Sequence, residues 1–114
     1  MESPASRISP DERAVPWADP WYLDDDASGT AERELQREAP VGHALYGIPV
    51  TLVARRCDCD DVLFRLADGS GRYAGVHLSF AVESNPDWPS TIIYDSLSHF
   101  VTERLHEDVT DYNT

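Results

Sequence analysis

Segment 24–29 of this 114-residue chain reads Asp-Asp-Asp-Ala-Ser-Gly, and its oxygen-bearing side chains have the spacing that opens a calcium-binding loop. Such a loop supplies a bidentate glutamate at its twelfth position. Counted from Asp24, that position holds Leu35, and Pro20 disfavours the helix that would enter the loop. We therefore predict an acidic turn before a helix in place of a calcium site.

Segment 57–61, Cys-Asp-Cys-Asp-Asp, brings two cysteines and three carboxylates together. A disulfide across one intervening residue is strained, and the chain has no second Cys/His pair to complete a zinc site. Val62 and Leu63 follow where a calcium loop needs turn and ligand residues. We predict a polar hairpin turn in which Cys57 and Cys59 are free thiols, with redox chemistry or metal binding as the alternatives.

His99, Glu103 and His106 are spaced i, i+4, i+7, so a regular helix would carry all three on one face. Two histidines and a carboxylate form a common metal-binding set. This face lies opposite the apolar stripe of the same helix, however, and we expect it to face water.

The nucleophilic and phosphate-binding patterns of enzymes are missing from the sequence. There is no Ser–His–acid or Cys–His arrangement, no HExxH, and the Gly-Ser-Gly of 69–71 lacks a P-loop lysine,. We predict no catalytic residues, no metal and no cofactor, and lean away from an enzyme. A small hydrolase or metal-dependent enzyme stays as a third hypothesis, which requires a pocket.

The elements that position these groups follow from apolar spacing. We predict a helix over 30–39, capped by Thr30 and ended by Pro40. Alternation predicts strands around 50–54, 62–66 and 74–80, and a short fourth strand over 91–94,. A second helix begins at Asp95 or Ser96 and runs to about Glu107, and the remaining residues look frayed. The predicted fold class is α+β: a three- to four-stranded antiparallel meander with an N-terminal and a C-terminal helix packed on it.

Register arguments place apolar side chains on one face of this sheet. A loop at 57–59 sets Ala54 opposite Val62 and Leu52 opposite Phe64. A loop at 69–71 sets Phe64 opposite Val76. The stripe of the C-terminal helix, formed by Leu97, Phe100, Val101 and Leu105, is then expected to bury against this face.

The second face of the sheet carries Arg55, Arg65, Tyr73 and His77. Two arginines with a histidine and a tyrosine could hold a carboxylate or a short acidic peptide. Alternatively, the first 29 residues fold back over this face and pair their aspartates with the arginines, since a thin sheet with an open half-apolar face needs a cover.

Residues 1–29 form a proline-rich, acidic lead-in to a single domain over 30–114. Prolines so spaced prevent a long helix and offer little to a sheet. The lead-in nevertheless contains Trp17, Trp21 and Tyr22. These aromatic rings either pack on the domain itself or anchor a partner protein, because Trp and Tyr lead among interface hot spots.

The charge balance is strongly negative, with 21 acidic against 9 basic residues, all nine arginine, and a net charge of −12. Such a field repels phosphate, so we expect no direct binding to nucleic acid or to anionic membranes. The negative charge attracts basic proteins toward the chain, or it contributes only to solubility. No apolar run nears the length of a membrane span and the N-terminus lacks a signal peptide, so we expect a cytoplasmic protein.

Several blocks resemble short uncharacterised bacterial proteins that carry similar blocks in the same order. The blocks are Gly42–Gly47, Ala54–Phe64, Val76–Leu78, Asp87–Pro89 and Tyr94–Ser96. The resemblance implies no known activity.

We therefore predict a non-enzymatic protein-interaction module of the immunity or accessory type, with an acidic surface and the aromatic lead-in as its contacts. The alternative is a small anionic-ligand domain that uses the Arg/His sheet face. The sequence leaves the oligomeric state open.

Overall fold

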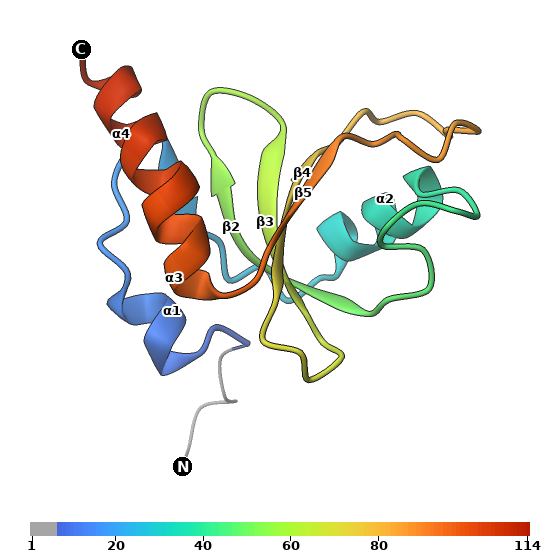
Figure 1. The fold of residues 1–114 in the computed structure, drawn as a ribbon, viewed down its shortest axis with the longest axis horizontal. Coiled ribbons are helices and arrows are strands. Elements are labelled where there is room, and N and C mark those ends of the chain that lie inside the picture. Colours follow the sequence, from blue (N-terminus) through green and yellow to red (C-terminus); the bar gives the residue numbers. More distant parts are fainter. Residues whose placement is uncertain (1–6) are drawn as a thin grey trace.

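The computed structural model describes residues 7–114, which fold around a five-stranded antiparallel sheet in the order β1-β2-β3-β4-β5. Each strand pairs with its neighbour in sequence, so the sheet is a simple meander (Figure 1). The strands are β1 (Trp21–Leu23), β2 (Val50–Arg56), β3 (Asp61–Leu66), β4 (Tyr73–His77) and β5 (Thr91–Tyr94). The helices are α1 (Pro10–Ala14), α2 (Thr30–Glu38), α3 (Leu97–Phe100), the π-helical η1 (Val101–Leu105) and α4 (His106–Tyr112).

The α+β class is confirmed, but the sheet has five strands where three or four were predicted. The extra strand is β1, which lies in the lead-in and pairs with β2 through Tyr22 opposite Arg55. The predicted fourth strand over 91–94 is present as β5. Pro20 immediately precedes β1 and no proline falls inside it, so the expectation that this segment adds little to a sheet is wrong.

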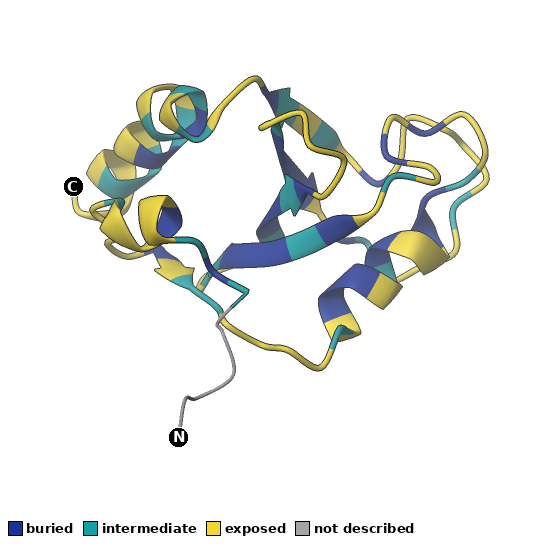
Figure 2. Ribbon diagram, turned by 90° about the horizontal axis from the view of Figure 1, so that it is seen from below, coloured by how far each residue is buried: buried dark blue, intermediate teal, exposed yellow. Residues whose placement is uncertain are grey.

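Helix α2 covers one face of the sheet. Its Ala31 and Leu35 pack on Leu52, Phe64 and other side chains that alternate along the strands. Figure 2 shows buried residues along the strands and on the side of α2 that faces them. This first core follows from the period-two pattern predicted for the strands.

The C-terminal helix, which we define as the continuous run α3, η1 and α4, covers the other face together with the lead-in. The second core contains Ile8, Trp21, Val53, Ala54, Leu63, Tyr73, Tyr94, Phe100 and Leu105. The prediction that the C-terminal stripe buries against the same face as Leu52 and Phe64 is therefore wrong. Val53 and Leu63 provide apolar surface on the second face, so each face receives its own cover.

The strand registers differ from prediction in two places. Leu52 lies opposite Phe64 as predicted, but a bulge between Leu52 and Ala54 sets Ala54 opposite Leu63 and turns it into the second core,. Strand β4 is shifted so that Ala74 lies opposite Phe64 and His77 opposite Asp61. Arg65 pairs with Tyr73, so the connection between β3 and β4 is two residues shorter than the predicted register required, and an even shift keeps each side chain on its face,.

The helix ends show which local signals hold. Helix α2 has Gly29 in the left-handed conformation at its N-cap, and Thr30 is already helical, so the predicted Thr30 cap is wrong. Ser96 caps the C-terminal helix and accepts a hydrogen bond from the His99 amide, as predicted. This helix continues to Tyr112 instead of fraying after Glu107.

Candidate binding site beside strand β5

The aromatic residues of the lead-in pack mainly on the chain itself. Trp21 is 0% exposed, meets Phe100 edge-to-face at 5.2 Å, and donates a hydrogen bond from Nε1 to Asp108 at 2.8 Å. Trp17 also packs on Phe100, with the ring centroids 6.1 Å apart, and donates to the Glu12 carbonyl. Tyr22 keeps an exposed ring, at 40%.

The predicted cation face is occupied by carboxylates of the chain. Arg65 and Tyr73 both bind the buried Glu12, and the Tyr73 hydroxyl donates to its carboxylate at 2.7 Å. Burial and then the neighbouring Glu12 raise the pKa of Tyr73, so its hydroxyl stays a donor. Arg55 forms an ion pair with Asp24 at 2.5 Å. An anionic ligand would have to displace these partners, and His77 lies apart from the set, beside Asp61.

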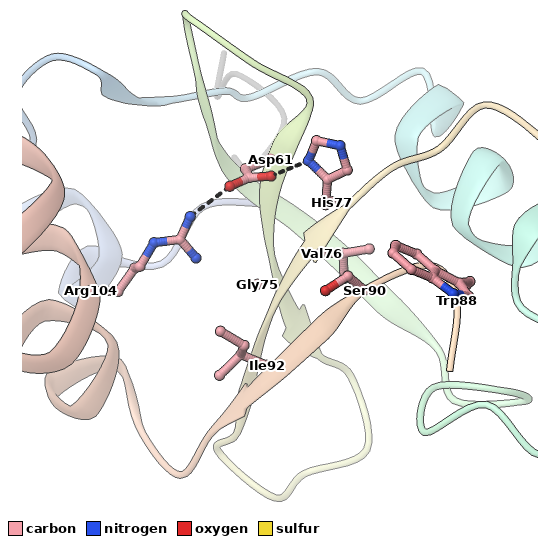
Figure 3. A pocket seen from close by; sticks show the side chains of 8 residues that line it. All are labelled: Asp61, Gly75, Val76, His77, Trp88, Ser90, Ile92 and Arg104. Atoms are coloured by element: carbon pink, nitrogen blue, oxygen red, sulfur yellow. Dashed lines mark hydrogen bonds and ion pairs between the residues drawn. The ribbon is translucent and has the colours of Figure 1, made fainter. Parts of the chain in front are cut away.

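Instead, the structure brings His77 into a hollow of about 520 Å³ that the sequence did not indicate (Figure 3). Strands β3, β4 and β5, the loop before β5, and the C-terminal helix all contribute to it. Its lining residues are Asp61, Gly75, Val76, His77, Trp88, Ser90, Ile92 and Arg104. We call this space the β5 groove.

Apolar side chains exposed to solvent form one side of the β5 groove. Trp88 is 47% exposed and Ile92 is 52% exposed. Gly75 lies opposite Ile92 in the sheet, and even a Cβ at Gly75 would approach the Tyr94 ring to 3.3 Å. Gly75 is itself buried, and its missing side chain lets the Tyr94 ring and the Arg104 guanidinium lie close to the strand beside Ile92.

The polar side of the β5 groove is held by Asp61, whose two oxygens each contact a different partner. One oxygen lies 2.6 Å from His77 Nδ1 and the other accepts from Arg104 at 2.6 Å. Arg104 also donates to Asp108 and lies over the Trp21 ring, with its guanidinium carbon 5.5 Å from the centroid. Burial alone would lower the pKa of Arg104, but its hydrogen bonds to Tyr94, Asp108 and Asp61 raise it. Arg104 is thus a fixed positive charge.

The side chain of His77, beside Asp61, is 52% exposed. Figure 3 shows the imidazole pointing toward Asp61 and away from Ser90. Within residues 7–114, no hydroxyl or thiol forms a recorded hydrogen bond with His77.

A second hollow of about 360 Å³ lies between β5 and the C-terminal helix and shares Ile92 and Arg104 with the β5 groove. Its lining also includes the exposed carboxylates Glu103 and Glu107. In the part of the chain that the structure describes, neither of these carboxylates forms an ion pair. The combined surface is thus apolar at its floor and acidic along the helix.

The structure separates the three residues that the sequence placed on one face of the C-terminal helix, His99, Glu103 and His106. His99 and Glu103 line this second hollow, whereas His106 lines another with Pro16 and Val109. The His106 amide bonds to the Val101 carbonyl, five residues back, and this π-helical turn breaks the i, i+7 alignment,. His99 Nδ1 accepts a hydrogen bond from the Asp95 amide. Across residues 7–114 no cluster of three metal-binding side chains is found.

The two acidic segments form turns. Asp24 and Asp26 each accept a hydrogen bond from the backbone amide two residues on, and Asp24 pairs with Arg55. In the β2–β3 loop Asp58 binds Arg56 with two contacts of 2.8 Å. Cys57 and Cys59 are free and exposed.

Trp88, Ile92, Glu103, Arg104 and Glu107 were missed as site residues. Trp88 carried one signal, an aromatic residue between two prolines in an irregular stretch, Pro86 to Pro89. Ile92, Arg104 and Glu107 looked like ordinary strand and helix residues, and Glu103 was considered only as part of a metal-binding set. Only the packing of the C-terminal helix beside β5 brings these four residues together.

In comparisons with known proteins, no family model, no curated protein and no solved structure matches the chain. The resemblance to short bacterial proteins stays a prediction. Over residues 7–114, no helix has the length and apolar composition required to cross a membrane.

Proposed function

We propose that this chain is a non-enzymatic interaction module of the accessory type that binds a basic protein partner at the β5 groove. The observation that carries the proposal is the pair of half-exposed apolar side chains, Trp88 and Ile92, at a hollow in a chain of net charge −12. Large apolar side chains at a concave surface are typical of sites that bind another molecule.

The chemistry of the groove supports a protein partner. Tryptophan is among the residues that contribute most binding energy at interfaces, especially where it can be fully desolvated. Trp88 and Ile92 both line the hollow and both are about half exposed, so a partner side chain could contact both. The lead-in rings Trp17 and Trp21 are engaged inside the chain and contribute to the fold.

The charges around the groove support a basic partner. Glu103 and Glu107 stand on the flanking helix without an ion pair among the described residues, and Asp87 precedes Trp88. These carboxylates favour lysine and arginine on the partner and speed encounter, an effect that salt weakens. The alternative, an anionic ligand on Arg55 and Arg65, is disfavoured because both arginines already bind carboxylates.

We also propose that the protein works in the cytoplasm. Cys57 and Cys59 are exposed free thiols, and a reducing compartment keeps such thiols unmodified,.

The test is affinity capture from lysate of the protein's own host, at low and at moderate salt, with mass spectrometry. Three baits are compared: the wild type, Trp88→Ala, and Tyr46→Ala. Tyr46 is the matched control because its ring is 55% exposed but lines a different hollow, beside α2.

We expect one dominant basic protein that the wild type and Tyr46→Ala retain and that Trp88→Ala loses. Moderate salt should weaken its capture. A partner retained equally by all three baits would contradict the assignment to the β5 groove, and the absence of any specific partner would contradict the interaction function.

A further inference from the structure

Strand β5 ends the sheet, and among residues 7–114 no further strand pairs with its outer edge. The His77 amide donates to the Ser90 carbonyl at 2.9 Å, which fixes the alternation of hydrogen-bonded pairs between β4 and β5,. Ile92 and Tyr94 therefore exchange backbone hydrogen bonds with β4. The N–H and C=O groups of Thr91 and Ile93 point away from the sheet.

The outer edge of β5 is open to a ligand. The hollow of about 360 Å³ borders Ile92, Ile93 and Tyr94 on one side and the C-terminal helix on the other. No proline or charged residue lies within β5 to block an added strand,.

We propose that the basic partner binds as an extended segment that adds to β5 as a sixth strand. This inference rests on the proposed function and specifies its ligand: a peptide of alternating basic and apolar residues. The backbone of the peptide bonds to Thr91 and Ile93. On the side of Ile92, a lysine or arginine lays its aliphatic stem over the isoleucine and directs its charge to Glu103 or Glu107.

Charge complementarity selects this occupant over a second copy of the chain. Two copies paired through β5 would bring together two molecules of net charge −12 and two sets of Glu103 and Glu107. A basic extended segment meets the same carboxylates with opposite charge and no such repulsion.

The first test uses a capped octapeptide that alternates arginine and valine, with an analogue that alternates glutamate and valine as control. Hydrogen–deuterium exchange of the full chain is read residue by residue with and without peptide. We expect the Thr91 and Ile93 amides to become protected on addition of the basic peptide, with little change at Ile92, which already bonds to β4. Binding without protection at Thr91 and Ile93 would overturn the proposal.

The second test N-methylates alternate amides of the basic peptide, in two complementary sets. Only every other amide of an added strand faces β5, so one methylated set should abolish binding and the other should retain it. An equal effect of both sets would overturn strand addition.

The third test neutralises the acidic wall with Glu103→Gln and Glu107→Gln together. The matched control is Asp11→Asn with Asp26→Asn, which removes two exposed carboxylates that lie outside β5 and the C-terminal helix. We expect the first pair of substitutions to lower the affinity for the basic peptide by about three- to tenfold at low salt. The control pair should change this affinity by less than about twofold. Equal weakening by the two pairs would place the peptide elsewhere.

The outcomes separate this inference from the proposed function. A basic partner that depends on Trp88, captured without protection at Thr91 and Ile93, would overturn strand addition and leave the interaction function intact. Self-association of the chain through β5 at micromolar concentration, seen in analytical ultracentrifugation, would overturn the choice of occupant.

Discussion

The carboxylate of Glu12, which is 0% exposed, receives Nη1 of Arg65 between its two oxygens at 2.6 and 2.7 Å. The two residues are 53 positions apart, so this contact ties the lead-in to the middle of the sheet. Ser9 adds a capping box, in which its amide donates to Glu12 and its hydroxyl accepts from the Glu12 amide. The second face of the sheet is closed by this ion pair together with Trp21.

Glu12→Gln should lower the free energy of unfolding by about 3 kcal/mol, because it leaves Arg65 against a neutral buried amide. Glu34→Gln is the control, since Glu34 pairs with Arg37 near the surface of α2 and should cost less than about 1 kcal/mol,. Urea denaturation at pH 7 measures both. Equal losses in the two variants would show that the Glu12–Arg65 pair does not anchor the lead-in.

The same carboxylate should make the fold sensitive to acid. Burial raises the pKa of Glu12, but hydrogen bonds from Ser9, Tyr73 and Arg65 outweigh it and hold the pKa below its ordinary value of 4.5. A lowered folded-state pKa gives stability that is present above 4.5 and lost as pH falls through the folded value. The difference in stability between wild type and Glu12→Gln should therefore shrink below pH 4.5, and a constant difference would contradict this.

Glu38 should have the opposite effect on the pH dependence of stability. It is 0% exposed and accepts hydrogen bonds from the Ser79 amide, the Ser79 hydroxyl and the Phe80 amide. Burial, followed by the hydrogen bond with Glu34, raises the pKa of Glu38 above 4.5. A raised folded-state pKa gives stability that is present below 4.5 and lost as pH rises through the folded value.

Denaturant midpoints between pH 4 and 8 test this effect in the wild type and in Glu38→Gln. We expect a decline in wild-type stability as pH rises above 4.5, and we expect the variant to lack it. Parallel curves for the two proteins would rule out a contribution from Glu38.

Phe80 has a φ of 56°, in the left-handed region that disfavours any residue with a Cβ, and its ring is 57% exposed. Phe80→Gly should remove this strain and retain the amide that binds Glu38, which stabilises the fold by about 0.5–1 kcal/mol. Val82→Gly is the control, because Val82 is 71% exposed and has no positive φ. This variant should lose stability by a similar amount, about 0.5–1 kcal/mol. Thermal unfolding measures whether each variant is more or less stable than the wild type. Destabilisation by Phe80→Gly would contradict the prediction.

Alanine variants of Trp21 and Trp88 should have different effects, the first mainly on stability and the second mainly on partner binding. Trp21→Ala removes a fully buried ring from the second core and should cost about 3–5 kcal/mol of stability,. Trp88→Ala removes a half-exposed ring and should cost about 1 kcal/mol or less, while it abolishes capture of the partner. Urea denaturation measures the two costs, and a large stability loss in Trp88→Ala would assign Trp88 to the fold.

Local pattern alone determined strands β2 to β5 and the start of the C-terminal helix. Alternating apolar residues predicted β2, β3 and β4 with one apolar face, because side chains of a strand alternate whatever its partners are, and α2 covers that face,. Asp95 or Ser96 was predicted as the cap of the C-terminal helix, and Ser96 is the cap, because its hydroxyl reaches an amide only three residues away,. These interactions lie within a few residues, so the sequence is sufficient for them.

Tertiary structure decided everything that joins distant segments. The pairing of β1 with β2, the bulge before Ala54 and the placement of the C-terminal helix on the second face depend on which apolar surfaces remain uncovered once the sheet forms. The sequence showed that the second face needed a cover, and it did not show that the C-terminal helix would share that task with the lead-in.

The candidate site depends entirely on tertiary packing. Asp61, Trp88, Ile92 and Arg104 come from β3, a loop, β5 and the C-terminal helix, and no short-range spacing connects them. Each looked ordinary in sequence: a turn acid, a loop aromatic, a strand isoleucine and a helix arginine. A concave surface exists only after the elements have packed, so its residues could be recognised only in the folded chain.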